Sequence, residues 1–371
     1  MTLTDFRWLI IWAFLGGIIL NLFAVQREEI VCGKKEYRWS WWAAIFLVLP
    51  YIIWAGNRDT SGAFGDSLAY YGMYRRVPTG WGEFLTYLDT ITKDKGYTVF
   101  MYLIKVIIGF RPYLYFTILA SIQMLLIVSV CRKYSCNYWL SIFIFIASTD
   151  YISWVHNGVR QFLAVTIIFG ATDLWVRKKY IPLIAIILLA STIHASAIIM
   201  IPVIFIVQGK PWNIRTILLL ILTILAVIYI DRFTDILNDA LVDTQYMGSV
   251  EEWKAIGDDG TNPVRVLVYS VPAILSLIGY KWIIEENNPV INLSVGCAIC
   301  TSLIYVISIF TSGIIIGRVP IYVSLYGACI LLPWELEHIF SANSALIVKG
   351  MAIAFYCAFF YYQMHLTWGI I

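Results

Sequence analysis

The feature that most constrains this chain is its series of long apolar runs, of which the segment 214–230 is one example. A helix needs about 20 mostly apolar residues to cross a hydrocarbon core about 30 Å thick. A membrane β-barrel would need short strands in which apolar and polar residues alternate, and these runs do not alternate. Because lipid offers the backbone no hydrogen-bond partners, each amide must pair within its own helix. The runs therefore predict an all-α membrane protein.

Composition narrows the class of protein further. Only 13% of the 371 residues are charged, whereas a typical soluble domain carries about 25%. Hydrophobic residues make up 60%, and the mean hydropathy is +0.79. A chain with so little polar surface cannot cover itself in water. These values exclude a soluble enzyme, a disordered protein and a secreted disulfide scaffold, and the net charge of +3 is too small to indicate nucleic acid as a partner.

The apolar runs predict a polytopic protein with about twelve transmembrane helices, organised as a single domain over residues 1–371. The expected spans are 6–24, 40–56, 112–131, 137–152, 158–175, 180–192, 195–208, 214–231, 264–283, 289–311, 318–333 and 345–363.

Lys and Arg gather in four short connections, which should face the cytoplasm by the positive-inside rule. They are Arg27, Lys34, Lys35 and Arg38; Arg132 and Lys133; Arg177, Lys178 and Lys179; and Lys210 and Arg215. This orientation places two long loops outside, over residues 57–97 and 232–263. Connections of that length are usually functional or disordered.

Two apolar stretches test this orientation. The stretch 180–207 would make a helix about 42 Å long at 1.5 Å per residue, which is too long for one span. Two short helices with an outward turn near Ser191–Ala195 solve this problem. The stretch 97–110 would reverse the orientation if it crossed, so we expect an interfacial helix there.

The centres of the expected spans carry almost no charge, which argues against a proton- or ion-coupled transporter. Instead, several cations, a carboxylate and a histidine come from distant segments to the outer side, as in many active sites. They are Arg58, Asp66, Arg160, His194, Arg265 and Arg318, with Tyr70, Tyr74 and Tyr97 nearby in the sequence. Each also has a simpler interpretation. An Arg at a helix end often reaches the lipid headgroups, a single His is often packed, and Asp66 can cap a helix.

The order of these motifs resembles that of the EpsG-like proteins, within the Wzy-type bacterial polysaccharide polymerases. The similar residues are Arg58, Gly65-Asp66, Tyr70 and Tyr74; Gly96-Tyr97; Asn157-Gly158-Val159-Arg160-Gln161; His194-Ala195-Ser196-Ala197; and Gly317-Arg318. The resemblance covers about residues 40–330. One departure concerns the acidic residue that usually precedes Gly96-Tyr97. Lys95 stands there, and Asp94 lies one step earlier.

The resemblance implies a glycosyltransferase of the bacterial cytoplasmic (inner) membrane with its active site on the extracytoplasmic face. Its substrate, as donor and as acceptor, would be an oligosaccharide repeat unit on undecaprenyl diphosphate. The product would be O-antigen, capsule or exopolysaccharide. The family also implies a chain-length regulator and a flippase as partners, besides the membrane lipids.

This chemistry assigns a role to each candidate. Arg160 and Arg318, then Arg58 and Arg265, would bind the diphosphate, because a guanidinium meets phosphate oxygens bidentately. His194 or Asp66 would take the proton of the acceptor hydroxyl. The sugar would be bound by Tyr70, Tyr74, Tyr97, Asn157 and Gln161.

No cluster has metal-ligand spacing, so we expect no metal or other cofactor, and direct displacement with inversion at the anomeric carbon. Three alternatives stay open. A polysaccharide ligase would need a similar set of Arg residues. A flippase or exporter of lipid-linked sugar would need a polar path through the membrane. A membrane acetyltransferase would draw its acyl donor from the inner side.

Overall fold

The computed structural model describes residues 3–61, 65–241, 260–313 and 315–368. These residues form helices and one two-stranded sheet, which confirms the predicted all-α class. By its contacts the chain divides into two compact units, residues 1–199 with 346–371, and residues 200–345. The single-domain organisation over 1–371 stays a prediction.

The first unit holds the N-terminal helices and most of the last one. Its elements are α1 (Leu3–Phe23), β1 (Gln26–Val31), β2 (Lys34–Trp39), α2 (Trp41–Gly56), α3 (Ser67–Arg76), α4 (Trp81–Thr90), α5 (Lys95–Ile108), α6 (Pro112–Tyr134), α7 (Tyr138–Ala147), α8 (Asp150–His156), α9 (Val159–Gly170), α10 (Thr172–Val176), α11 (Tyr180–Ile193) and η1 (Ala195–Ile199). The helix α21 (Ala342–Tyr362) joins this unit from Leu346 onward.

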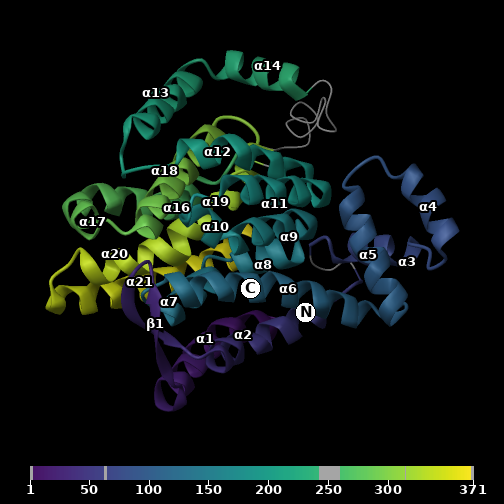
Figure 1. Cartoon of the computed structure of the whole chain (residues 1–371), viewed down its shortest axis with the longest axis horizontal. Helices are drawn as coiled ribbons and strands as arrows, with labels where there is room; N and C mark the ends of the chain where they lie inside the picture. The colour runs from purple at the N-terminus through teal and green to yellow at the C-terminus, as the bar shows by residue number, and fades with distance from the viewer. Residues whose placement is uncertain (1–2, 62–64, 242–259, 314, 369–371) are drawn as a thin grey trace. The chain divides into compact units, whose positions relative to one another are not determined.

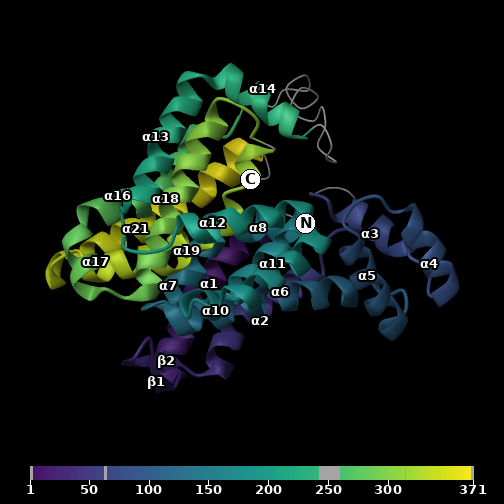
Figure 2. The same cartoon turned by 45° about the horizontal axis from the view of Figure 1, so that its top comes forward.

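The long helix α6 organises the first unit. It packs against both α2 and α9, and α9 packs in turn against α11. Gly56 allows the close approach of α2 to α6, because a Cβ there would lie 2.0 Å from the Oγ1 of Thr117. Figures 1 and 2 both show α3, α4 and α5 grouped beside the beginning of α6.

The segment 57–97, expected to be a long loop, is largely helical. It contains α3 and α4, and Lys105 of α5 fixes the end of α3 by donating to the main-chain carbonyls of Tyr74, Arg75 and Val77 at 3.1, 2.8 and 2.6 Å. The helix expected over 97–110 is confirmed as α5, over Lys95–Ile108. For the second expected loop, 232–263, the structure describes α14 (Ile230–Leu241), whereas residues 242–259 lie outside the described residues.

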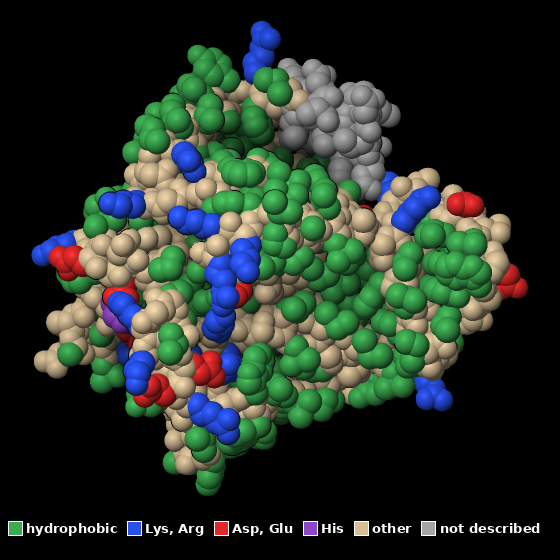
Figure 3. All heavy atoms as spheres, in the orientation of Figure 1, with side chains coloured by type: hydrophobic (Ala, Val, Ile, Leu, Met, Phe, Trp, Pro, Cys, Tyr) green, Lys and Arg blue, Asp and Glu red, His purple; other side chains and the backbone are tan. Residues whose placement is uncertain are grey.

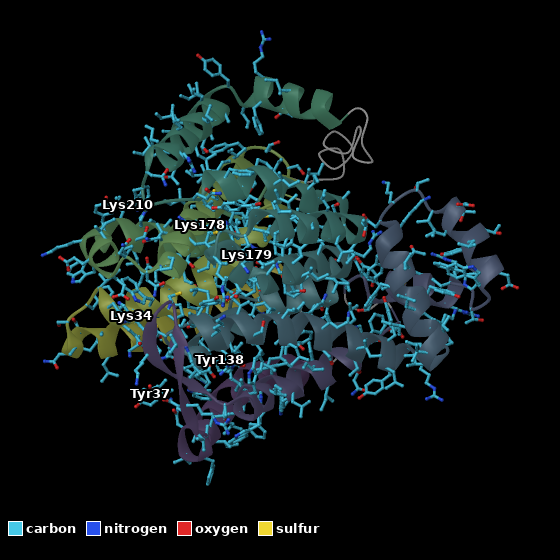
Figure 4. All side chains as sticks on the ribbon, viewed as in Figure 1. Lys34, Tyr37, Tyr138, Lys178, Lys179 and Lys210 are labelled. Carbon is cyan, nitrogen blue, oxygen red and sulfur yellow. The ribbon has the colours of Figure 1, made fainter. Side chains whose placement is uncertain are left out.

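Three of the four basic connections meet on one face of the first unit. The hairpin β1–β2 docks on the end of α6, where Arg132 pairs with Glu29 at 2.8 Å and Arg38 donates to the carbonyl of Lys133 at 2.9 Å. Lys133 and Arg177 both pair with Asp173 of α10. Figure 4 shows Lys34 and Tyr37 on this hairpin, and Lys178 and Lys179 side by side after α10. This grouping is the one that the positive-inside orientation requires.

The Glu29–Arg132 pair makes the hairpin sensitive to acid. The hydrogen bond from Arg132 lowers the pKa of Glu29, so the pair contributes stability above the unfolded pKa of about 4.3 and loses it as the pH falls through the lower folded value. Replacing Glu29 with Gln should cost about 1 kcal/mol, since Glu29 is partly exposed. We expect faster proteolysis within residues 26–39, at neutral pH in this variant and below about pH 4 in the wild type.

The control variant is Glu28→Gln, on the opposite face of the same strand. Glu28 pairs with the exposed Lys35, at 2.7 Å, so its loss should leave the cleavage rate unchanged. Equal cleavage rates in Glu28→Gln and Glu29→Gln would contradict this account of the hairpin.

The second unit is built around α18, which is mostly buried and packs against α13, α16 and α19. Its elements are α12 (Met200–Ile206), α13 (Ile214–Ile228), α14, α16 (Pro263–Ile278), α17 (Tyr280–Glu286), α18 (Pro289–Ile309), η2 (Ile316–Arg318), α19 (Ile321–Tyr326), the π-helical turn η3 (Gly327–Leu331) and α20 (Leu332–His338). The hydrophobic side chains of α13 are widely exposed, as Figure 3 shows. Ile214, Leu222 and Ile228 keep 66%, 61% and 63% of their surface.

By length and composition, five described helices can cross a membrane, or seven if each bent pair counts as one span. One bent pair is α7 with α8, at 67°. Five further apolar helices have 10–17 residues. The chain is therefore a membrane protein, and the number of about twelve spans stays a prediction.

The expectation that the span centres carry almost no charge stays a prediction, and the structure buries two acids within apolar helical stretches. Asp150 begins α8 at the bend after α7, and its residue is 2% exposed. Glu335 lies within the apolar stretch Ile316–His338 and is 0% exposed. The spans expected from the sequence, 137–152 and 318–333, end near Asp150 and before Glu335, and charge is tolerated at such positions.

Candidate active site

Asp94 joins three segments of the first unit. It precedes α5 with the backbone in the left-handed region, at φ 53°, and its side chain is 3% exposed. One carboxylate oxygen lies 3.0 Å from the Nη1 of Arg160 on α9, and the other accepts a hydrogen bond from the N–H of Ala195 at 3.1 Å. Burial raises the pKa of Asp94, while Arg160 acts in the opposite direction.

Arg160 lies in the first turn of α9 and is held from several sides. Its main-chain N–H donates to the hydroxyl of Tyr70 at 3.3 Å. Its side chain is 29% exposed. The guanidinium also interacts with the hydroxyl of Tyr70, while its buried Nε–H makes no hydrogen bond of good geometry among the described residues. A buried donor without a partner is rare in proteins and is available to a bound acceptor.

Asp66, just before α3, contacts the turn that precedes Arg160. It accepts a hydrogen bond from the N–H of Gly158 at 3.2 Å. Gly158 has φ +66°, a conformation that side-chain-bearing residues rarely adopt. Gly65 approaches the carbonyl oxygen of His156, which would lie 3.0 Å from a Cβ at Gly65. Asp66 therefore helps to fix the turn from which Arg160 projects.

His194 occupies the predicted turn between two apolar helices. It follows α11 in an extended conformation, it is half-buried, and its Nδ1 lies 2.7 Å from the Oγ of Ser196. The next residue, Ala195, provides the N–H that binds Asp94. The structure thus brings Asp66, Arg160 and His194 to one region, in which Asp94 connects Arg160 to the His194 turn and Asp66 bonds to Gly158.

The site and the basic face lie at opposite ends of the helical segment formed by α9 and α10. The chain runs from Arg160 through α9 and α10 to Asp173, which is about 20 Å of helix at 1.5 Å per residue. Asp173 is the residue that pairs with Lys133 and Arg177. If those cations face the cytoplasm, the Asp94–Arg160 pair belongs near the outer surface.

The three predicted sugar-binding tyrosines are buried. Tyr70, Tyr74 and Tyr97 keep 5%, 0% and 0% of their surface. Tyr74 stacks on Tyr115 at 4.2 Å, and Tyr97 hydrogen-bonds through its hydroxyl to that of Tyr115. Rings packed in this way present no open face for a sugar, so the observed role of these residues is to support the site.

Arg58 is bonded to main-chain carbonyls, within electrostatic reach of Tyr70 and Tyr97. It is 5% exposed and donates to the carbonyls of Ala55 at 2.7 Å and Val155 at 2.8 Å. Its guanidinium lies 4.4 Å above the ring of Phe116, and burial lowers its pKa to about 10. Arg58 thus caps main-chain carbonyls in the last turns of α2 and α8. The sequence alone did not predict this structural role.

Asn157 and Gln161 flank the turn that holds Arg160. Asn157 follows α8 and is half-buried, whereas Gln161 is 3% exposed within α9. Only Asn157 therefore keeps substantial surface for a sugar contact. Sugar binding by either residue stays a prediction.

Arg265 and Arg318 belong to the second unit. Arg265 lies in the first turn of α16, with its guanidinium 5.5 Å from the ring centre of Tyr269, and Arg318 ends η2. Thr261, which precedes α16, contacts residues next to Arg318. It bonds to Ser308 through main chain and side chain, and its Oγ1 would lie 2.3 Å from a Cβ at Gly317. The roles proposed for both arginines stay predictions.

Within the part of the chain that the structure describes, no three His, Cys, Asp or Glu residues could hold a metal ion together. The expected independence from metal therefore stays a prediction. Positive charge at the site comes from Arg160 itself.

The helical architecture and the apolar spans define an integral membrane protein with a buried acid–arginine pair at the ends of its helices. The chain belongs to the EpsG family, whose model matches residues 41–368. That family is associated with polysaccharide biosynthesis. No curated protein and no solved structure matches the chain.

Proposed function

We propose that this protein is a glycosyltransferase that joins oligosaccharide repeat units carried on undecaprenyl diphosphate at the outer face of the bacterial cytoplasmic membrane. The observation that supports this proposal is the Asp94–Arg160 pair, bonded to the turn of His194. Family membership supports polysaccharide biosynthesis as the setting.

Arg160 would bind the departing diphosphate. As the bond from the anomeric carbon to the phosphate oxygen breaks, its electron pair stays on that oxygen, and negative charge develops there. The buried Nε–H of Arg160 is a free donor for such an oxygen, and Asp94 fixes the guanidinium in advance. Preorganised donors of this kind contribute about 10²–10³-fold in rate.

The acceptor hydroxyl attacks the anomeric carbon from the opposite face, which inverts the configuration. Its proton must pass to a base as the new carbon–oxygen bond forms. His194 is half-buried beside the pair and is our first candidate, and Asp66 is the second. Asp94 is committed to Arg160 and to Ala195, so we assign it the task of positioning them.

Asp94 predicts a pH dependence. Because burial raises its pKa, Asp94 should lose its charge, and its hold on Arg160, at a higher pH than an exposed aspartate would. We expect the wild-type rate to fall on the acid side. In Asp94→Asn the rate should be at least about 10-fold lower and should lack this acid limb, as initial rates across pH will show. An unchanged acid limb in Asp94→Asn would assign it to another group.

The direct test mixes the purified chain with one synthetic undecaprenyl-diphosphate-linked repeat unit and no other acceptor. A polymerase produces a ladder of lengthened lipid-linked chains, whereas a ligase, which needs a different acceptor, produces none. A flippase or exporter changes the location of the substrate and leaves its length unchanged. Absence of lengthened product with the cognate repeat unit would overturn the proposal.

A further inference from the structure

Glu335 is a buried acid of the second unit that the proposed chemistry does not use. It lies on α20, within the apolar stretch Ile316–His338. The residue is 0% exposed, and neither of its carboxyl oxygens has a hydrogen-bond partner among the described residues. Buried polar groups in proteins are almost always paired, so such a group requires an explanation.

The backbone before Glu335 is irregular. Residues Gly327–Leu331 form a π-helical turn, in which the N–H of Leu332 bonds to the carbonyl of Gly327. Pro333 follows and has no N–H to donate to the preceding turn. π-helical turns are rare, and they occur often at functional sites. The irregular backbone and the unpartnered acid are separate observations that mark the same segment.

The charged groups near α20 do not neutralise Glu335 in the described structure. On α20 itself, Glu337 is half-buried and His338 is exposed, with the His338 ring stacked on Trp334. Two elements pack most closely against α20, and the polar Ser276 of α16 is engaged with Trp212 and with the carbonyl of Ala273. The turn η3 carries Cys329, and the single charged residue of α16, Arg265, lies in its first turn.

The end of α16 that approaches α20 is remote from Arg265. Gly279, just after α16, packs so closely against Ile339 that a Cβ there would lie 2.2 Å from the Ile339 Cδ1. Beyond Gly279, α17 carries Lys281 and Glu285, whose side chains are 78% and 62% exposed. The charged side chains of α16 and α17 are thus remote from Glu335 or exposed, and its carboxyl oxygens have no hydrogen-bond partner among the described residues.

An ionised carboxylate without a partner is strongly disfavoured in such surroundings, whereas a neutral carboxylic acid is tolerated. We propose that Glu335 is an intramembrane proton-binding site. The ligand is a proton, held as the O–H bond of the carboxylic acid and returned to water when Glu335 ionises. Acids inside membrane helices commonly serve in proton relays. This inference does not depend on the proposed glycosyltransferase activity.

Infrared spectroscopy of the full chain tests this proposal. The wild type is labelled with ¹³C at the glutamate side chains, purified in lipid nanodiscs, and measured at pH 8. Exposed glutamates are ionised there, so a carbonyl stretch of a protonated, ¹³C-labelled acid reports a buried glutamate. We expect this band in the wild type, with a small shift in D₂O.

Two variants assign the band to its residue. Glu335→Gln should lose the band, whereas the matched variant Glu337→Gln, two residues away on the same helix, should keep it. The proposal is overturned if the wild type shows no protonated glutamate at pH 8, or if the band survives in Glu335→Gln. If Glu335→Gln does not fold, Glu335→Asp takes its place, because it keeps an acid at this position and removes the ¹³C-labelled glutamate carboxyl group.

Discussion

Replacing Arg160 with Lys should lower the rate of chain lengthening by about 100-fold or more, although the positive charge is kept. The Nη1 of Arg160 is engaged by Asp94, and its Nε–H remains available. A guanidinium can make both contacts at once because its donors form a rigid fork. An ammonium is a point charge on a flexible stem, so it can pair with Asp94 or with the phosphate and cannot orient both.

The initial rate of ladder formation measures this effect. Arg76→Lys is the matched control, since Arg76 is exposed at the end of α3, and this variant should retain the wild-type rate. Full activity in Arg160→Lys would mean that another cation stabilises the leaving group, and Arg318 would then be the next candidate.

The second large effect is expected at Gly96, which itself carries no reacting group. A Cβ at Gly96 would lie 2.2 Å from the Oγ1 of Thr192 and 2.8 Å from its main-chain carbon. Because a main-chain atom cannot rotate away, Gly96→Ala must push α5 off α11. That movement would separate Asp94, two residues earlier, from Arg160. We expect a loss of about 1–3 kcal/mol in stability and at least a 10-fold loss in rate.

Thermal unfolding and initial rates together test this prediction. Gly72→Ala is the control, because nothing lies within 4 Å of a Cβ at Gly72 in the middle of α3. This variant should be as active as the wild type and equally or slightly more stable. The account of the α5–α11 contact fails if Gly96→Ala and Gly72→Ala behave alike.

Much of the helical architecture could be predicted from the length of the apolar runs. The turn at His194 followed from length, because one helix over 180–207 would exceed the membrane thickness. The structure confirms this break, with α11 ending at Ile193. The helix near 97–110 was also predictable, since its apolar run is too short to cross.

The role of Asp94 was not predictable. In the sequence it stands one step before the usual acidic position, and Lys95 takes that position. The left-handed backbone of Asp94, at φ 53°, places its carboxylate against Arg160 and Ala195. Sequence patterns do not report such a local conformation, because its partners Arg160 and Ala195 come from distant segments of the chain.

Burial also gives different roles to residues that look alike in the sequence. Arg58 and Arg160 both stand near the ends of apolar helices, yet Arg58 is 5% exposed and bonded to two main-chain carbonyls, whereas the Arg160 side chain is 29% exposed and pairs with Asp94. Tyr74 looked like a stacking residue and proved to be part of the core. Tertiary packing decides between these roles.

The measurement that tests the central claim most directly follows a single round of joining between two lipid-linked repeat units by the purified chain. The wild type should convert them to one doubled chain on lipid and release one undecaprenyl diphosphate. Folded Asp94→Asn and Arg160→Lys should do so at least about 10-fold and 100-fold more slowly, respectively. Wild-type rates in both folded variants would contradict the assignment of this pair as the active site.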